Sequence, residues 1–285
     1  MESQIHVRLC ESADTSRVRN FLSRASFFHR HLDWREPLDW VNKRSFYLAL
    51  NEIDELQGAF CSSPEIKNFF WIRLFACSNK NNLFKTWHAL FDSFLDANNL
   101  TKNSPLLFTL AYYPWMMQLL ELEGGKLIDR IVQLESSALL KTDSQNYFST
   151  KSIHKMKRAD LEDVFEIDRS RFPPIWQQSF KTLSLSFKQV NYSTVFRNKN
   201  RIIGFQMSTI STNRAHLARI AVDQDFSRMG IGTALIQDLL THCHQLNIRK
   251  ISVNTQETNK NSITLYKKMG FKDIGNSYPI YQLDG

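Results

Sequence analysis

The residues from Ile220 to Thr233 have the types and spacing of an anion-binding turn. An apolar run, expected to end a strand, is followed by a polar turn and then by the start of an amphipathic helix. The residues concerned are Ile220, Ala221 and Val222, then Arg228, Met229, Gly230, Ile231, Gly232 and Thr233. Free main-chain amides and the helix dipole attract an anion at such a helix start, and glycines let it approach closely. On this segment alone, a purely structural loop fits equally well.

A second segment, from Asn259 to Phe271, decides between these interpretations. It reads N-K-N-S-I-T-L-Y-K-K-M-G-F, and with Ser227–Gly232 (S-R-M-G-I-G) it resembles the two motifs of the GNAT acetyltransferase superfamily. The similarity extends over roughly residues 151–281, with one helix and one strand between the motifs. Two positions depart from the family pattern: Ser227 stands where Arg or Gln is usual, with Arg228 beside it, and Ser262 replaces a small Ala.

The resemblance implies that acetyl-coenzyme A is the co-substrate. Strands 216–222 and 250–255 are expected to part and to receive the pantetheine arm, while residues 228–233 hold the pyrophosphate. The binding residues implied in this way are Ile220, Ala221, Val222, Arg228, Met229, Gly230, Ile231, Gly232, Thr233, Asn259, Ser262 and Tyr266.

The family mechanism is direct attack of an amine on the thioester, without an acyl-enzyme. The resemblance places Tyr266 beside the thioester as general acid, although a tyrosine on an apolar helix face can also be core packing. His216 is the first candidate for the base and Glu257 the second, because a histidine titrates in the useful range; a histidine on a strand can equally be a bystander. Residues 166–176 are similar to the acceptor-groove stretch of ribosomal-protein N-terminal acetyltransferases, or they form a rigid packed turn.

The elements that must position these residues occur in the same order in both halves of the chain. In the second half we expect strands or hairpins at 152–156, 192–196, 201–209, 216–222 and 250–255, and helices at 161–170, 231–246 and 262–269. In the first half we expect strands at 5–9, 45–50, 56–61, 69–76, 106–110 and 128–134, and helices at 16–26, 83–97 and 115–122. We interpret this as a duplication; two unrelated α/β domains are the alternative.

The predicted fold class is α/β (α+β by some schemes), with two GNAT-like domains, each a mixed, mostly antiparallel twisted sheet flanked by helices. The predicted domains are residues 1–140 and 151–285, joined by a linker at 141–150. The first half has no glycine between Cys77 and Leu83 and has Tyr112–Met116 where the second motif should be. It is therefore expected to be a degenerate repeat that binds no coenzyme.

Charge is unevenly distributed over the 285 residues, which carry 36 Lys+Arg and 28 Asp+Glu. Residues 151–285 hold 20 basic and 11 acidic residues, a net of +9, and the first 150 hold 16 and 17, a net of −1. A basic half can attract a phosphorylated ligand, nucleic acid or an acidic surface, or can be a solvated face. We find no RNA-binding signature and no helix-turn-helix pattern, so we do not expect a nucleic-acid partner.

The remaining features describe an ordinary core-forming protein. We expect no signal peptide, because residue 2 is acidic and no long apolar run follows it, and we find no apolar run long enough for a membrane span. The four cysteines are scattered and the eight histidines form no ligand set, so a metal-free, cytoplasmic protein is expected. The predicted acceptor is a primary amine, on a small molecule or at a peptide N-terminus, and the predicted assembly is a monomer or homodimer. The alternative function is a non-catalytic acyl-coenzyme A sensor or interaction module.

Overall fold

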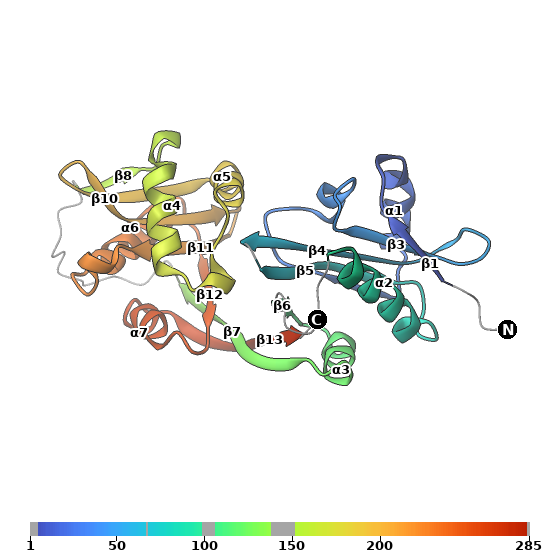
Figure 1. The fold of residues 1–285 in the computed structure, drawn as a ribbon. Coiled ribbons are helices and arrows are strands. Elements are labelled where there is room, and N and C mark those ends of the chain that lie inside the picture. The colour runs from blue at the N-terminus through green and yellow to red at the C-terminus, as the bar shows by residue number, and fades with distance from the viewer. Residues whose placement is uncertain (1–4, 67, 99–105, 138–151, 284–285) are drawn as a thin grey trace. The chain divides into compact units, whose positions relative to one another are not determined.

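The structure is a computed structural model that describes residues 5–66, 68–98, 106–137 and 152–283. The chain forms two compact units, which are described separately. The first unit comprises Met1–Ile128 and Pro279–Gly285, and the second comprises Asp129–Tyr278 (Figure 1). The predicted linker at residues 141–150 lies outside the described residues, so that boundary stays a prediction.

The helices and strands follow the predicted order, with two additions that were not predicted, β2 and α5. The helices are α1 (Thr15–Leu22), α2 (Leu83–Ala97), α3 (Pro114–Leu122), α4 (Leu161–Arg171), α5 (Phe180–Gln189), α6 (Ile231–Gln245) and α7 (Lys260–Lys268). The strands are β1 (His6–Leu9), β2 (Phe27–Arg30), β3 (Phe46–Leu50), β4 (Leu56–Ile66), β5 (Phe69–Cys77), β6 (Leu106–Leu110), β7 (Lys126–Ser137), β8 (Ile153–Lys155), β9 (Tyr192–Asn198), β10 (Arg201–Ile210), β11 (Arg214–Val222), β12 (Lys250–Gln256) and β13 (Lys272–Leu283). No helix among these is both long and apolar enough to cross a bilayer.

The first unit is a mixed sheet between two helical layers. Its strand order is β1-β3-β4-β5-β6-β13, in which only β5 and β6 run parallel. Alternate strand residues face opposite sides. Phe60 and Phe75 pack with Trp87 and other residues of α2 and α3, whereas Phe46 and Leu74 pack on the side of α1.

The second unit repeats this plan. Its strand order is β7-β12-β11-β10-β9-β8, and β11 and β12 form the parallel pair. Helices α6 and α7 cover one face, where Leu217, Ile251 and Phe271 are buried, and α4 and α5 cover the other, where Phe205 and Met207 are buried. The predicted fold class, a mostly antiparallel mixed sheet flanked by helices in each half, is confirmed.

The last strand of each half belongs to the other unit's sheet. Strand β7 follows α3 of the first unit, and from Ile131 to Ser137 it pairs with β12 of the second. Strand β13 follows α7 of the second unit, and from Ile280 to Leu283 it pairs with β6 of the first. Each sheet therefore includes a strand from the opposite half of the sequence, which the division at residues 141–150 did not anticipate.

Candidate active site

The parallel strands β11 and β12 pair over only part of their length. Their paired Cα atoms run from Arg214 opposite Lys250 to Leu217 opposite Val253. Beyond that point β11 continues to Val222, and each strand pairs only with its outer neighbour, β10 or β7. The inner edges therefore carry main-chain groups with no strand partner among the described residues. This opening, here called the fork, is what the family resemblance implies.

A β-bulge bends β11 where the fork begins. Met207 of β10 lies opposite Arg219 and Ser208 lies opposite Leu217, so Ala218 is an extra residue in β11. A bulge bends its strand and increases the local twist. The rest of β11 is thereby directed away from β12.

The loop after β11 leads into the N-terminus of α6. Asp223 shapes the turn: its carboxylate accepts from the Asp225 amide at 3.1 Å and pairs with Arg201 at 2.6 Å. Arg228 and Gly230 both have left-handed φ angles, of 61° and 82°. Gly230 is the N-cap of α6 and offers no side-chain cap. Within the described ranges, the first amides of α6 therefore have no acceptor at the positive end of the helix dipole, an arrangement suitable for a diphosphate.

The two glycines of this loop serve different purposes. Gly230 permits the left-handed turn. A Cβ on Gly232 would lie 3.1 Å from Leu265 Cδ2 and 3.8 Å from Val222 Cγ2, so this glycine lets α6 approach α7 closely. Ile231, which stands between the two glycines in the sequence, is buried against Phe196 and Ile203 of the sheet and fixes the first turn of the helix. The residues predicted to hold the pyrophosphate, from Arg228 to Thr233, thus lie together in one loop and helix start.

Asn259 joins α7 to one arm of the fork. Its side-chain oxygen accepts from the Ser262 amide at 3.3 Å and caps α7, while Nδ2 donates to Thr255 Oγ1 of β12 at 3.3 Å. The motif asparagine therefore positions α7 as well as being a predicted contact of the coenzyme.

Tyr266 lies in the hydrophobic cluster beneath the point where the strands part. It shares this cluster with Leu217 and Val253, the last paired residues of the fork, and its ring lies 5.8 Å from that of Phe271. The side chain is 4% exposed, and the hydroxyl makes no hydrogen bond to any residue that the structure describes. Burial raises the pKa of Tyr266, so the phenol stays protonated at neutral pH.

His216 lies on the opposite face of the sheet from Tyr266. Its neighbours Ala215 and Leu217 face α6 and α7, so the intervening side chain faces α4 and α5. His216 Nδ1 is 2.9 Å from Ser252 Oγ of β12, one position before the fork opens. Burial lowers the pKa of His216, which keeps the ring neutral near pH 7. Ser252 was not among the predicted site residues.

Arg219 connects the fork to the loop between α4 and α5. Its guanidinium donates to both carboxylate oxygens of Asp168, which is fully buried, and to the Trp176 carbonyl at 2.9 Å. It also stacks over the ring of Phe172, 3.7 Å from the centroid. The segment that resembles an acceptor groove is thus anchored to the first residue beyond the bulge.

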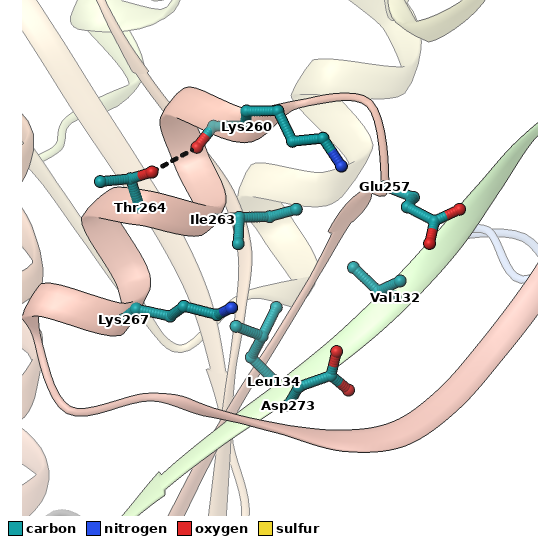
Figure 2. Close-up of a pocket in the computed structure, with 8 residues that line it drawn as sticks. All are labelled: Val132, Leu134, Glu257, Lys260, Ile263, Thr264, Lys267 and Asp273. Carbon is teal, nitrogen blue, oxygen red and sulfur yellow. Dashed lines mark hydrogen bonds between the residues drawn. The ribbon is translucent and has the colours of Figure 1, made fainter.

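A separate pocket of about 320 Å³ lies on the side of α7 facing β7 (Figure 2). Val132, Leu134 and Ile263 supply its apolar part, and the charged side chains around them are Glu257, Lys260, Lys267 and Asp273. On α7 this face lies opposite the one that carries Leu265, so the pocket is distinct from the fork. Glu257, the second candidate base, lines this pocket, whereas His216 lies on the α4 and α5 face of the sheet.

The first unit contains the same fork, but it is filled. Strand β5, like β11, has nine residues; it pairs with β6 only from Phe69 to Trp71, and Arg73 is the extra residue of a bulge. Arg73 in β5 and Ala218 in β11 are each the fifth residue of a nine-residue strand. Beyond the bulge, Leu74–Cys77 pairs with Phe27–Arg30 of β2. The edge that stays open in the second unit is therefore occupied by the chain itself in the first.

Comparison with known proteins agrees with this geometry. The acetyltransferase (GNAT) family matches residues 161–271. The ribosomal protein bS18-alanine N-acetyltransferase of Escherichia coli K12 is 23% identical over 131 residues, which cover 45% of this chain and 87% of that protein. The N-alpha-acetyltransferase of Sulfurisphaera tokodaii is 24% identical over 135 residues, covering 43% and 80% respectively.

A solved structure shares the fold over both halves. It is a tandem GNAT protein from the clavulanic acid biosynthesis pathway, which matches with a TM-score of 0.62 and 11% identity over 99% of this chain and 98% of that one. The expected duplication therefore corresponds to a known architecture. The chain is an acyltransferase of the N-acetyltransferase class, with a GNAT-family domain in its second half and the tandem GNAT fold overall.

Proposed function

We propose that the protein transfers an acetyl group from acetyl-coenzyme A to a primary amine by direct attack on the thioester. The observation that carries this proposal is the fork, because its open edge lies next to a helix start with free amides. The amides around Gly230 and Gly232 would bind the diphosphate, and the main chain of Ile220, Ala221 and Val222 would bind the pantetheine arm.

Tyr266 and His216 are suited to the two proton transfers. The amine loses a proton when it attacks, and the departing thiolate gains one; general acid–base catalysis of this kind contributes about 10²–10⁴-fold. Tyr266 is the proposed acid, since its phenol is protonated and no described residue forms a hydrogen bond with its hydroxyl. His216 is the proposed base, directly or through water, since its ring is neutral near pH 7.

A covalent acyl-cysteine intermediate is not needed. All four cysteines are buried, and burial raises the pKa of the Cys243 thiol, in α6, to about 11. Burial likewise raises the pKa of Cys61 to about 12. Thiols of this kind are poor nucleophiles at neutral pH, which favours direct transfer.

The acceptor we propose is the N-terminal amine of a peptide or protein, with a small-molecule amine as the second choice. The relatives named above act on such termini. In this chain the α4–α5 loop, held by Arg219, borders the face on which His216 lies. We also propose that the first half binds no coenzyme, because β2 occupies its fork, and that the enzyme is cytoplasmic.

The test is release of free thiol from acetyl-coenzyme A by the full chain with a panel of peptides and amines. Tyr266→Phe should lower turnover by about 10²–10⁴-fold while calorimetry shows unchanged coenzyme binding. The matched control is Tyr113→Phe, at an exposed position of the first unit, which should behave as wild type.

Two outcomes would count against the proposal. An absence of heat on mixing with acetyl-coenzyme A removes it entirely. Coenzyme binding with no turnover on any acceptor favours the alternative, a non-catalytic acyl-coenzyme A sensor or interaction module.

A further inference from the structure

Among the residues that the structure describes, His216 has one side-chain hydrogen-bond partner, at the mouth of the fork. The two residues are directly opposite in the β11–β12 pairing, and His216 Nδ1 lies 2.9 Å from Ser252 Oγ. Which atom donates decides which ring nitrogen can accept a proton from substrate, because a neutral imidazole has one protonated and one free nitrogen.

The serine hydroxyl has a second acceptor within reach. Ser252 Oγ donates to the Ala215 carbonyl at 3.4 Å. A hydroxyl carries a single proton and two lone pairs. With its proton on Ala215, Ser252 Oγ can only accept from His216 Nδ1–H.

From this geometry we infer that Ser252 is a positioning residue that holds His216 as the Nδ1–H tautomer, leaving Nε2 as the base. The inference rests on the proposed function for its chemical meaning. In the transfer step, Nε2 takes the proton that the amine loses as its nitrogen bonds to the acetyl carbon, and the thiolate leaves with a proton from Tyr266. The imidazolium formed donates through Nδ1 to Ser252.

The charged groups around this pair do not compete for Nδ1. Glu135 of β7 lies opposite Ser252 and on the same face, and it is paired with Lys250 at 3.8 Å. Arg219 of β11 is engaged by Asp168 of α4. Ser252 is therefore the group that fixes the imidazole.

The tautomer can be read without any substrate. Long-range ¹H–¹⁵N correlation spectra of the full chain labelled with ¹⁵N-histidine, assigned with His216→Gln, should show Nε2 as the unprotonated nitrogen. In Ser252→Ala this signature should change, and Ser252→Thr, which keeps the hydroxyl, should restore it. An unprotonated Nδ1 in the wild type would overturn the inference.

Kinetics provide the second arm. Ser252→Ala should lower kcat/KM by about tenfold, the loss expected for one net hydrogen bond, and Ser252→Thr should recover it. In a His216→Ala background, Ser252→Ala should have no further effect. The control is Ser211→Ala, whose hydroxyl contacts the Arg214 carbonyl in an exposed turn.

The spectra and the kinetics together distinguish a failure of this inference from a failure of the proposed function. Equal, additive losses in the double variant would show that Ser252 acts independently of His216 and would refute the inference, even though acetyl transfer stands. Absence of acetyl transfer by the wild type would refute the proposed function, whereas the histidine spectrum would still report which nitrogen of His216 is protonated.

Discussion

Replacing Arg219 by methionine should destabilise the second unit strongly, because the fully buried carboxylate of Asp168 would lose its ion-pair partner. The exposed fraction is 0% for the Asp168 side chain and 12% for that of Arg219. The substitution removes two hydrogen bonds to the carboxylate, one to the Trp176 carbonyl, and the contact with the Phe172 ring. Breaking a buried pair on one side costs about 3–5 kcal/mol, since the remaining charge has no partner.

An exposed arginine of the same unit gives the matched control. Arg201 pairs with Asp223 at 2.6 Å, but its side chain is 62% exposed. Exposed pairs contribute at most about 1 kcal/mol. Arg201→Met should therefore cost far less than Arg219→Met, although the two substitutions are chemically identical.

Urea unfolding at neutral pH measures both variants. Circular dichroism follows the unfolding. Tryptophan fluorescence is the second probe, to which Trp176, the only one of the six tryptophans between residues 129 and 278, contributes a signal from the loop between α4 and α5. Replacing both partners, as Arg219→Met with Asp168→Leu, should recover most of the loss. If Arg219→Met lowers the free energy of unfolding no more than Arg201→Met does, the ion pair and loop contacts of Arg219 do not stabilise the unit, and the reasoning fails.

Three further predictions concern other sites. Gly230→Glu should weaken acetyl-coenzyme A binding more than tenfold in calorimetry, because it puts a carboxylate at the proposed anion site and because a side chain is strained at φ +82°. The control is Gly275→Glu, which has a similar φ of +78° but lies in open space and should leave coenzyme binding unchanged. Gly58→Ala should lower the unfolding free energy by about 1–3 kcal/mol, because the new Cβ would lie 2.2 Å from Thr86 Cγ2. Burial lowers the pKa of His29 to about 3, so between about pH 6.5 and pH 5 the unfolded chain binds a proton that the folded chain does not. The contribution of His29 to stability is full above about pH 6.5 and falls by about 2 kcal/mol by pH 5. His29→Gln should remove that part of the acid loss in urea titrations, whereas the part from His31, whose pKa burial also lowers, should remain.

Local patterns predicted most elements and grouped the residues of the loop that we propose binds the coenzyme. Helix α2 and strand β6 have the predicted bounds, and α6 and β11 differ by one or two residues. In these segments the hydrophobic residues recur at a regular spacing, or turn residues flank the element, and both signals depend only on residues that are close in sequence. The residues of the loop from Arg228 to Thr233 are contiguous, so a motif was sufficient to group them.

The missed elements depend on contacts that neighbouring residues do not encode. Helix α5 carries Leu183, Leu185 and Phe187 at alternate positions, which suggests a strand, yet Ser179 caps a helix there by accepting from the Thr182 amide. Strand β2 has four residues and exists through its pairing with β5. The exchange of β7 and β13 requires pairing between residues more than 100 positions apart.

The missed site residues have the same cause. In the sequence, the strands that contain Arg219 and Ser252 show only an alternation of apolar and polar residues, and this alternation does not single out either side chain. Their importance comes from partners 51 and 36 positions away, Asp168 and His216. No spacing within one segment reveals such pairs.

The two forks together argue that the open one is kept for a ligand. Main-chain groups at a strand edge must find partners, and an unpaired edge is a liability for a folded chain. Both units have the same bulge, yet in the first the chain supplies Phe27–Arg30 to complete the edge. In the second, the edge ends at a glycine loop and at the start of a helix whose first amides have no acceptor in the part of the chain that the structure describes. An extended molecule that carries amides along its length and a diphosphate at one end satisfies both sets of groups at once, and this is the chemistry of coenzyme A.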